Sequence, residues 1–76
     1  MGEKPKDELL ETARRHVREG AARVASQEAL VMRLDRLGHV ELAQQADWIL
    51  STLKASVRLA RDDLLERLFH LGAGQR

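Results

Sequence analysis

The sequence predicts an all-α protein, a two-helix antiparallel hairpin that dimerises into a four-helix bundle. Leucine, alanine, arginine and glutamate are frequent among its 76 residues, whereas the chain has five glycines, one proline and two aromatic residues. This composition is typical of long helices rather than sheet. Apolar residues recur at spacings of three and four in two long segments. A short turn containing glycine separates the segments, and two helices joined in this way run antiparallel.

The first helix is expected over about residues 7–37, after a disordered tail at residues 1–6. Pro5 and Asp7 suit a helix start, because proline fits the first turn and acidic side chains favour its positive end. A heptad stripe follows, with valine at every second position and one polar member, Gln27, which we predict sets the register of the seam. The stripe comprises Leu10, Ala13, Val17, Gly20, Val24, Gln27, Val31 and Leu34.

Gly20 stands on this stripe, inside the helix. Glycine in a helix interior costs about 1 kcal/mol relative to alanine. Two interpretations stay open: the helices approach each other closely at Gly20, or the helix tolerates the glycine there.

The turn is expected at residues 38–40. Arg36 places a cation in the last helical turn, and Gly38 can adopt the left-handed conformation that ends a helix. A second helix is expected over about residues 41–71, followed by a disordered tail at residues 72–76. Its apolar stripe repeats at about 3.6 residues. This stripe comprises Leu42, Ala46, Ile49, Leu53, Val57, Ala60, Leu64, Leu68 and Leu71.

Trp48, the single tryptophan of the chain, falls on the side of the second helix that points away from its apolar stripe. Exposed apolar stripes mark interfaces, so the sequence predicts a homodimer, which also supplies the core that so short a chain lacks. Two alternatives stay open: a tryptophan that lies flat on the surface or packs within its own chain at the turn end, and a stripe that binds a different, unidentified protein. The predicted interface residues are Gln27, Trp48, Ala55, Leu59, Leu65 and Phe69.

The sequence holds no pattern typical of an enzyme or a metal site. The absence of cysteine excludes thiolate zinc sites and cysteine nucleophiles. His16, His39 and His70 fall far apart on a hairpin. The serines lie within helices without histidine and aspartate partners in reach, and no glycine-rich loop could hold a phosphate. We therefore expect a protein without catalytic activity, cofactor or metal.

Membrane attachment is not expected either. With histidine counted as charged, the longest uncharged run, at residues 48–53, is far shorter than the roughly 20 residues of a membrane span. Lys6 stands where a myristoylation motif requires serine or threonine. We expect a cytoplasmic protein.

Arginine supplies ten of the thirteen basic residues, and several lie on the outward side of the first helix. A row of guanidinium groups can bind nucleic-acid phosphates, so a regulator that binds RNA or DNA is the alternative function. The net charge of +1 favours an ordinary solvated face instead. The candidate nucleic-acid residues are Arg14, Arg15, Arg18, Arg33 and Arg36.

Three short motifs lie in the first helix and the turn: H-V-x-E-G at residues 16–20, R-V-x-x-Q at residues 23–27 and G-H at residues 38–39. The pattern, which extends mainly over residues 16–60, resembles short hypothetical bacterial helical-hairpin proteins of unassigned function. Length and heptads also resemble Rop-type hairpin dimers, in which two hairpins form a four-helix bundle with one face that binds paired RNA loops. These resemblances imply the hairpin and its dimerisation, and they assign no mechanism.

Overall fold

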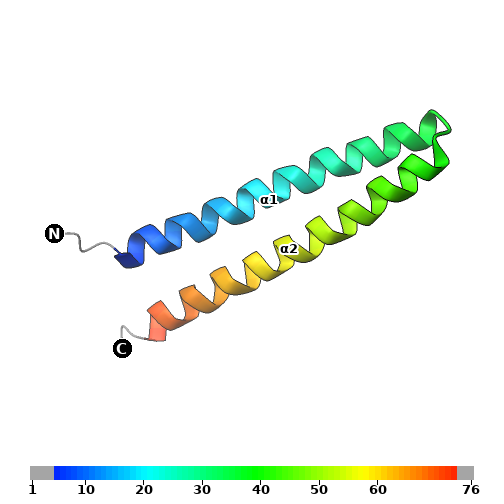
Figure 1. Ribbon diagram of the computed structural model, residues 1–76. Coiled ribbons are helices and arrows are strands. Elements are labelled where there is room, and N and C mark those ends of the chain that lie inside the picture. Colours follow the sequence, from blue (N-terminus) through cyan, green and yellow to red (C-terminus); the bar gives the residue numbers. More distant parts are fainter. Residues whose placement is uncertain (1–4, 74–76) are drawn as a thin grey trace.

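The computed structural model describes residues 5–73, with the side chains of residues 8–70. Helix α1 (Pro5–Arg36) and helix α2 (Val40–Ala73) run antiparallel and form the predicted all-α hairpin (Figure 1). The hairpin measures 56 × 23 × 13 Å. Of the predicted tails, residues 1–4 and 74–76 lie outside the described residues, and the remaining positions next to them belong to the helices.

A Schellman motif around Gly38 ends α1. Gly38 has a φ of 82°, in the left-handed region that glycine adopts at little cost. The amide of His39 donates to the carbonyl of Leu34, and the amide of Gly38 donates to the carbonyl of Asp35, both at 3.0 Å. The carbonyl of His39 accepts a hydrogen bond from the amide of Ala43 at 2.9 Å, so α2 begins directly after the motif. Gly38 thus supplies the sharp turn of the hairpin.

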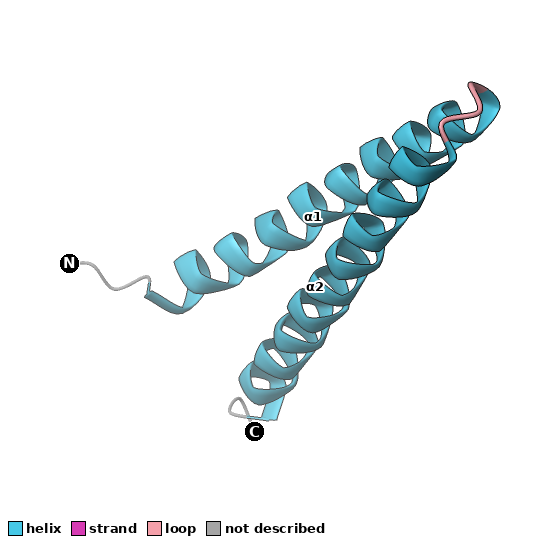
Figure 2. Ribbon diagram, turned by 45° about the vertical axis from the view of Figure 1, so that its right-hand side comes forward, coloured by secondary structure: helices cyan, strands magenta, loops and turns pink. Residues whose placement is uncertain are grey.

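Small side chains form much of the seam between the two helices. The buried apolar residues are Ala13 on α1 and Ala43, Ala46, Leu50 and Val57 on α2. Three of these five lie in the first turns of α2. Figures 1 and 2 show that the helices are nearest to each other at the turn and separate toward the termini. The tightest packing therefore lies in the half of the hairpin next to the turn.

Gly20 allows a close contact with α2 at the middle of the seam. A Cβ atom added at Gly20 would lie 2.8 Å from Cγ2 of Val57, well inside van der Waals contact. Val57 is itself buried, so its methyl group fills the space that the glycine leaves. Of the two interpretations of Gly20 that the sequence leaves open, the structure favours the close approach.

The seam of α2 differs from the predicted stripe near the turn. Leu42 and Ile49, predicted to lie in the seam, are 52% and 47% exposed, whereas their neighbours Ala43 and Leu50 are buried. Two helices that stay in contact share one repeat, and the stripe of α1 is a heptad. Counting back from Val57 in heptads gives Leu50 and then Ala43. An averaged helical repeat of about 3.6 residues drifts away from this heptad line and selects the wrong neighbours.

At the open end the seam of α2 is less well covered. Leu64 is half-buried, and Leu10 near the start of α1 is half-buried as well. Leu68 is 37% exposed. Leu71, the last member of the predicted stripe, lies outside the described side chains. The wider separation of the helices at this end explains the exposure (Figure 2).

Candidate interaction surface

Large apolar side chains are exposed along the whole hairpin. Three of them are at least 70% exposed: Trp48 at 73%, and Leu59 and Phe69 at 70% each. Single exposed apolar residues are normal on a protein surface, whereas a contiguous group marks a binding surface. The exposed large apolar residues are Leu9, Met32, Leu37, Val40, Leu42, Trp48, Ile49, Leu59, Leu65, Leu68 and Phe69.

One contiguous group of these side chains lies on α2, in the half that follows the turn. Between Leu42 and Val57 the helix has two charged residues, Asp47 and Lys54, which stand seven residues apart and therefore share one side. Nζ of Lys54 lies 3.7 Å from Oε2 of Glu28 on α1. The remaining outer side carries no charge over about four turns. We call it the uncharged α2 face; it consists of Leu42, Gln45, Trp48, Ile49, Thr52, Ala55, Ser56 and Leu59.

Three of the predicted interface residues, Trp48, Ala55 and Leu59, belong to the uncharged α2 face, and all three are exposed. Oγ1 of Thr52 donates to the carbonyl of Trp48 at 3.3 Å. Such a bond to the preceding turn satisfies the threonine hydroxyl within its own helix. The polar group at the centre of the face therefore needs no partner from outside it.

Leu42 and Ile49 are members of the face that the sequence pattern missed, because the averaged repeat assigned them to the seam. Their exposure widens the face toward α1, on the side where Leu37 is 64% exposed and Leu30 is half-buried. When the heptad repeat of α1 is also applied to α2, it places Leu42 and Ile49 outside the seam. This repeat is therefore the sequence signal that could have identified them.

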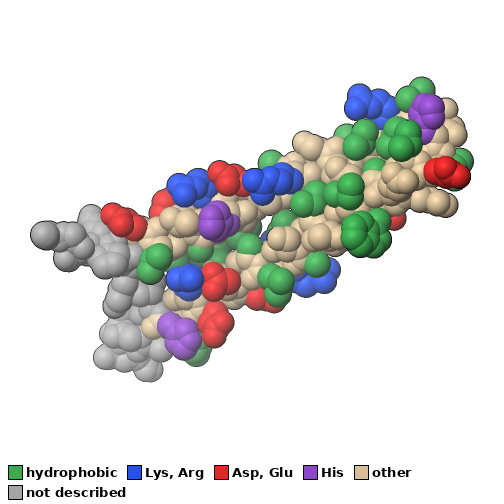
Figure 3. Space-filling model, in the orientation of Figure 1, with side chains coloured by type: hydrophobic (Ala, Val, Ile, Leu, Met, Phe, Trp, Pro, Cys, Tyr) green, Lys and Arg blue, Asp and Glu red, His purple; other side chains and the backbone are tan. Residues whose placement is uncertain are grey.

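Charge is unevenly distributed along the hairpin. On the surface shown in Figure 3, most acidic and basic side chains lie over the half with the termini, and hydrophobic side chains spread over the middle and the half near the turn. The uncharged α2 face therefore belongs to a larger part of the surface that is poor in charge.

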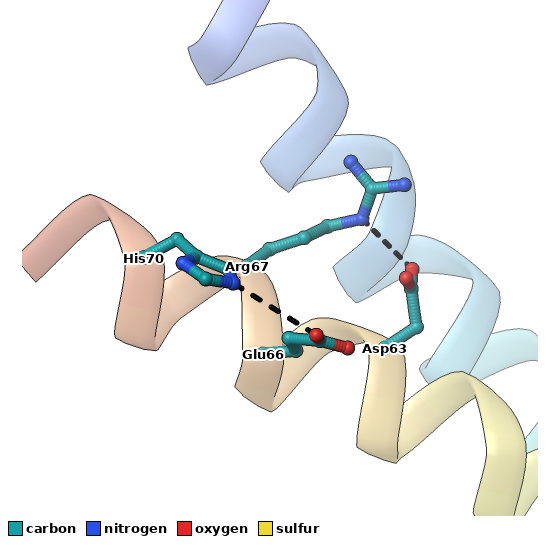
Figure 4. A network of polar contacts seen from close by, with 4 residues as sticks. All are labelled: Asp63, Glu66, Arg67 and His70. Carbon is teal, nitrogen blue, oxygen red and sulfur yellow. Dashed lines mark hydrogen bonds and ion pairs between the residues drawn. The ribbon is translucent and has the colours of Figure 1, made fainter.

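The second half of α2 carries a network of charged side chains (Figure 4). Nε of Arg67 donates to Oδ2 of Asp63 at 2.8 Å. Nε2 of His70 lies 3.8 Å from Oε2 of Glu66. Both pairs join residues four apart on one helix, and exposed pairs of this kind contribute about 0.3–0.5 kcal/mol each. They support the helix, and both members of each pair belong to α2.

Leu65 and Phe69, two further predicted interface residues, lie in this charged half. They are 63% and 70% exposed. The rings of Phe69 and His70 meet edge to face, with centroids 5.8 Å apart and an angle of 68° between their planes. Charged residues at Arg61, Asp62 and Asp63 stand between Leu59 and these two side chains in the sequence. The structure thus divides the predicted interface residues of α2 into two groups.

Gln27, the polar member of the α1 stripe, lies within the hairpin seam and is half-buried. Its Nε2 donates to the carbonyl of Ala46 on α2 at 2.8 Å. The half-buried amide makes this bond at one relative position of the two helices, so it favours one register over its neighbours. Gln27 therefore contacts the other helix of its own chain.

The candidate arginines of α1 are all exposed. Nη2 of Arg18 lies 3.6 Å from Oε2 of Glu11, and Nε of Arg15 lies 3.9 Å from Oε2 of Glu19. Two others occupy the last turn of α1, where the negative end of a helix favours cations. The five positions are Arg14, Arg15, Arg18, Arg33 and Arg36, and four of them thus have a structural explanation within α1.

Within residues 5–73, the structure brings no three histidine, aspartate or glutamate side chains close enough together to hold a metal ion. Neither helix of that part of the chain is long and apolar enough to cross a bilayer.

Comparison with known proteins gives no relative: no family model, no curated protein and no solved structure matches this chain. The resemblance to short bacterial hairpin proteins and to Rop-type dimers stays a prediction. Functional inference therefore depends on the surface of the hairpin itself.

Proposed function

We propose that this chain is a self-associating helical hairpin, in which two copies form a four-helix bundle that serves as a structural or protein-interaction module. It acts without catalysis and without a cofactor. The observation that carries the proposal is the exposure of large apolar side chains around a very small core. Trp48 and Leu59 are 73% and 70% exposed, while three of the five buried apolar residues are alanines.

The balance of burial supports self-association. Removing a leucine-sized or larger side chain from water contributes about 1.5–3 kcal/mol, and an alanine contributes much less. A 76-residue chain also leaves a large share of its surface exposed when it folds alone. A second copy that covers the exposed apolar side chains would add several such contributions to each chain, which is a common solution for small helical proteins.

The arrangement of polar groups is consistent with a module that performs no chemistry. A catalytic site brings an acid, a base or a nucleophile together in a pocket that excludes water. Here the ion pairs within the described side chains lie on the surface, and each of their members is 43% or more exposed.

The arginines of α1 do not favour the alternative of a nucleic-acid-binding regulator. Affinity for phosphates depends on cations that are available to neutralise them. Arg15 and Arg18 already lie beside carboxylates of their own helix. The net charge of +1 supplies no long-range attraction for a polyanion.

Sedimentation equilibrium at micromolar concentration tests the proposal. We expect a dimer for the wild type and a dissociation constant raised at least about tenfold in Trp48→Ala, because large aromatic side chains dominate interface energies. Met32→Ala is the matched control, since Met32 is 57% exposed on α1 and lies outside the uncharged α2 face. A wild type that stays monomeric at every concentration would contradict self-association and would point to a different protein as the partner.

A further inference from the structure

The uncharged α2 face has a pattern that is nearly the same when read from either end. The midpoint of the face lies between Leu50 and Ser51. Leu42 and Leu59 are equally far from this midpoint, in opposite directions along the sequence. The two residues next inward on this face are Gln45 and Ser56, both polar and uncharged. At the ends of the face a leucine thus mirrors a leucine, and next inward a polar residue mirrors a polar one.

The central pairs are mixed in polarity or in size. Ile49 mirrors Thr52, whose hydroxyl is already bonded to the carbonyl of Trp48 at 3.3 Å. Trp48 stands within two residues of the position opposite Ala55, so a very large side chain lies near a small one. Close packing between helices depends on such alternation of large and small side chains.

A pattern of this kind fits one class of partner. A twofold interface uses the same patch on both subunits, so that each residue meets its mirror residue in the other copy. Two α2 helices placed antiparallel across a twofold axis satisfy this condition, with Leu42 of each copy on Leu59 of the other. A different protein would have no reason to be matched by an internal mirror pattern in this chain.

We infer that a second copy of this chain docks on the uncharged α2 face, with the two α2 helices antiparallel and the twofold axis passing between Leu50 and Ser51. The inference rests on the proposed self-association and specifies its surface and orientation. Trp48 of each copy then covers Ala55 of the other. The interface includes Leu42 and Ile49 and leaves Leu65 and Phe69 outside it.

The distribution of charge favours the antiparallel orientation over the parallel one. Asp62, Asp63 and Glu66 follow Leu59 at helical spacing and continue the same side of α2. In the antiparallel dimer these acids lie beside the start of the other α2, where the positive end of the helix favours carboxylates. In a parallel dimer each acid would lie beside the same acid of the other copy, which is unfavourable.

Charged residues of both signs lie at the end of the hairpin next to the turn. Arg33 and Arg36 occupy the last turn of α1, next to the start of α2. Glu41 is an acid at the same end. Asp35 and Asp47 line the groove formed with Val40, Ala43 and Gln44 beside the seam, on the side of α2 away from the uncharged face.

The exposed area of the chain is large for its mass. The whole chain, termini included, exposes 5993 Å², compared with about 4,700 Å² for a compact monomer of this mass. A stable interface of standard size removes about 800 Å² from each partner. The face extends from Leu42 to Leu59, about 26 Å at 1.5 Å per residue, and the exposed Leu37 beside it can add to the contact.

Cysteine cross-linking determines the orientation, because the chain has no cysteine of its own. Gln45→Cys and Ser56→Cys proteins are prepared separately, mixed in equal amounts, oxidised and analysed by mass. We expect a disulfide between the two variants in the mixture, because these positions face each other across the axis. Gln45→Cys alone should remain uncross-linked, since its two copies lie about 16 Å apart along the helix, beyond the reach of a disulfide. Ala22→Cys, exposed on α1, is the control for random oxidation.

A second comparison checks the surface without relying on cross-linking. Phe69 is an aromatic residue exposed to the same degree as Trp48, but it lies in the charged half of α2. We expect Phe69→Ala to change the dissociation constant of the dimer less than about threefold, while Trp48→Ala raises it at least about tenfold.

The outcomes separate the two proposals. A dimer in which Gln45→Cys cross-links to itself would overturn the antiparallel orientation and leave self-association intact. A dimer that depends on Phe69 rather than Trp48 would overturn the choice of surface. A monomeric wild type would overturn the proposed function together with this inference.

Discussion

The two halves of the hairpin are held together in different ways. Next to the turn, polar contacts cross from helix to helix: Nε2 of Gln27 bonds the carbonyl of Ala46 at 2.8 Å, and Glu28 pairs with Lys54 at 3.7 Å. Leu50 is buried in the same half. These contacts all link α1 to α2, so they fix the distance and the register between the helices.

In the half with the termini, the ion pairs of the described side chains stay within one helix. Arg18 lies beside Glu11 on α1, and Arg67 beside Asp63 on α2. Such pairs stabilise each helix by a few tenths of a kcal/mol and do not attach it to its neighbour. The helices separate in this half (Figure 2). Contacts between helices, rather than the number of ion pairs, determine where the hairpin is tight.

The largest expected effect compares two leucines at the same heptad position in the two halves. Leu50 is buried and Leu64 is half-buried. Leu50→Ala should lower the free energy of unfolding by about 2–4 kcal/mol, because it leaves a cavity in the tight half. Leu64→Ala should cost about half as much, since its surroundings are already open to water. Urea unfolding followed by circular dichroism, at one protein concentration, measures both.

Equal losses in the two variants would mean that the open half is as well packed as the turn half. Leu65→Ala serves as the control, because Leu65 is 63% exposed on the same helix. Its effect on unfolding should stay within about 0.5 kcal/mol.

An intermediate effect is expected at the boundary between the halves. Gly20→Ala adds a Cβ atom 2.8 Å from Cγ2 of Val57, and the overlap should lower the free energy of unfolding by about 1 kcal/mol. In a Val57→Ala background the overlap is gone. The same substitution should then raise the free energy of unfolding by up to about 1 kcal/mol, because alanine is the better helix former.

The decisive result is the change in sign of the effect of Gly20→Ala on the free energy of unfolding. A double-mutant cycle by urea unfolding measures it. If Gly20→Ala stabilised the protein in the presence of Val57, the helices would not be in close contact at Gly20.

The smallest expected effect compares an ion pair between helices with one inside a helix. Glu28→Gln should lower the free energy of unfolding by less than about 1 kcal/mol, because both partners are about half exposed. Glu11→Gln should have a smaller effect still, since its pair with Arg18 lies within α1. Thermal unfolding in low and high salt checks both, because salt screens exposed pairs. A larger salt-dependent loss for Glu11→Gln would reverse the comparison.

Much of the fold is predictable because the signals are local. Gly38 marks the turn through its freedom to adopt positive φ, and the heptad of α1 identifies the residues that face α2. The position of Trp48 away from the seam follows from helical periodicity and agrees with its 73% exposure.

The remaining details depend on the pairing of the helices, which local signals do not contain. Leu42 and Ala43 are neighbours, and the choice between them depends on the repeat that α1 imposes on α2. The carbonyl of Ala46 accepts the hydrogen bond of the Gln27 amide. This acceptor can be predicted only when the register between the two helices is known to within one residue. Trp48 and Phe69 belong to different surfaces of α2, because the charged residues Arg61, Asp62 and Asp63 interrupt the apolar pattern between them.

The three-residue connection around Gly38 also has a consequence for how the chain folds. Partners across the seam are near in sequence beside the turn, as for Gln27 and Ala46, which are 19 residues apart, and distant toward the termini. The entropy of closing a loop rises with its length, so the pairs beside the turn form at the lowest cost. We expect the transition state for folding to hold the turn and the first turns of α2 already docked, with the helices joining progressively toward their free ends. The low contact order of such a hairpin is typical of proteins that fold within microseconds to milliseconds.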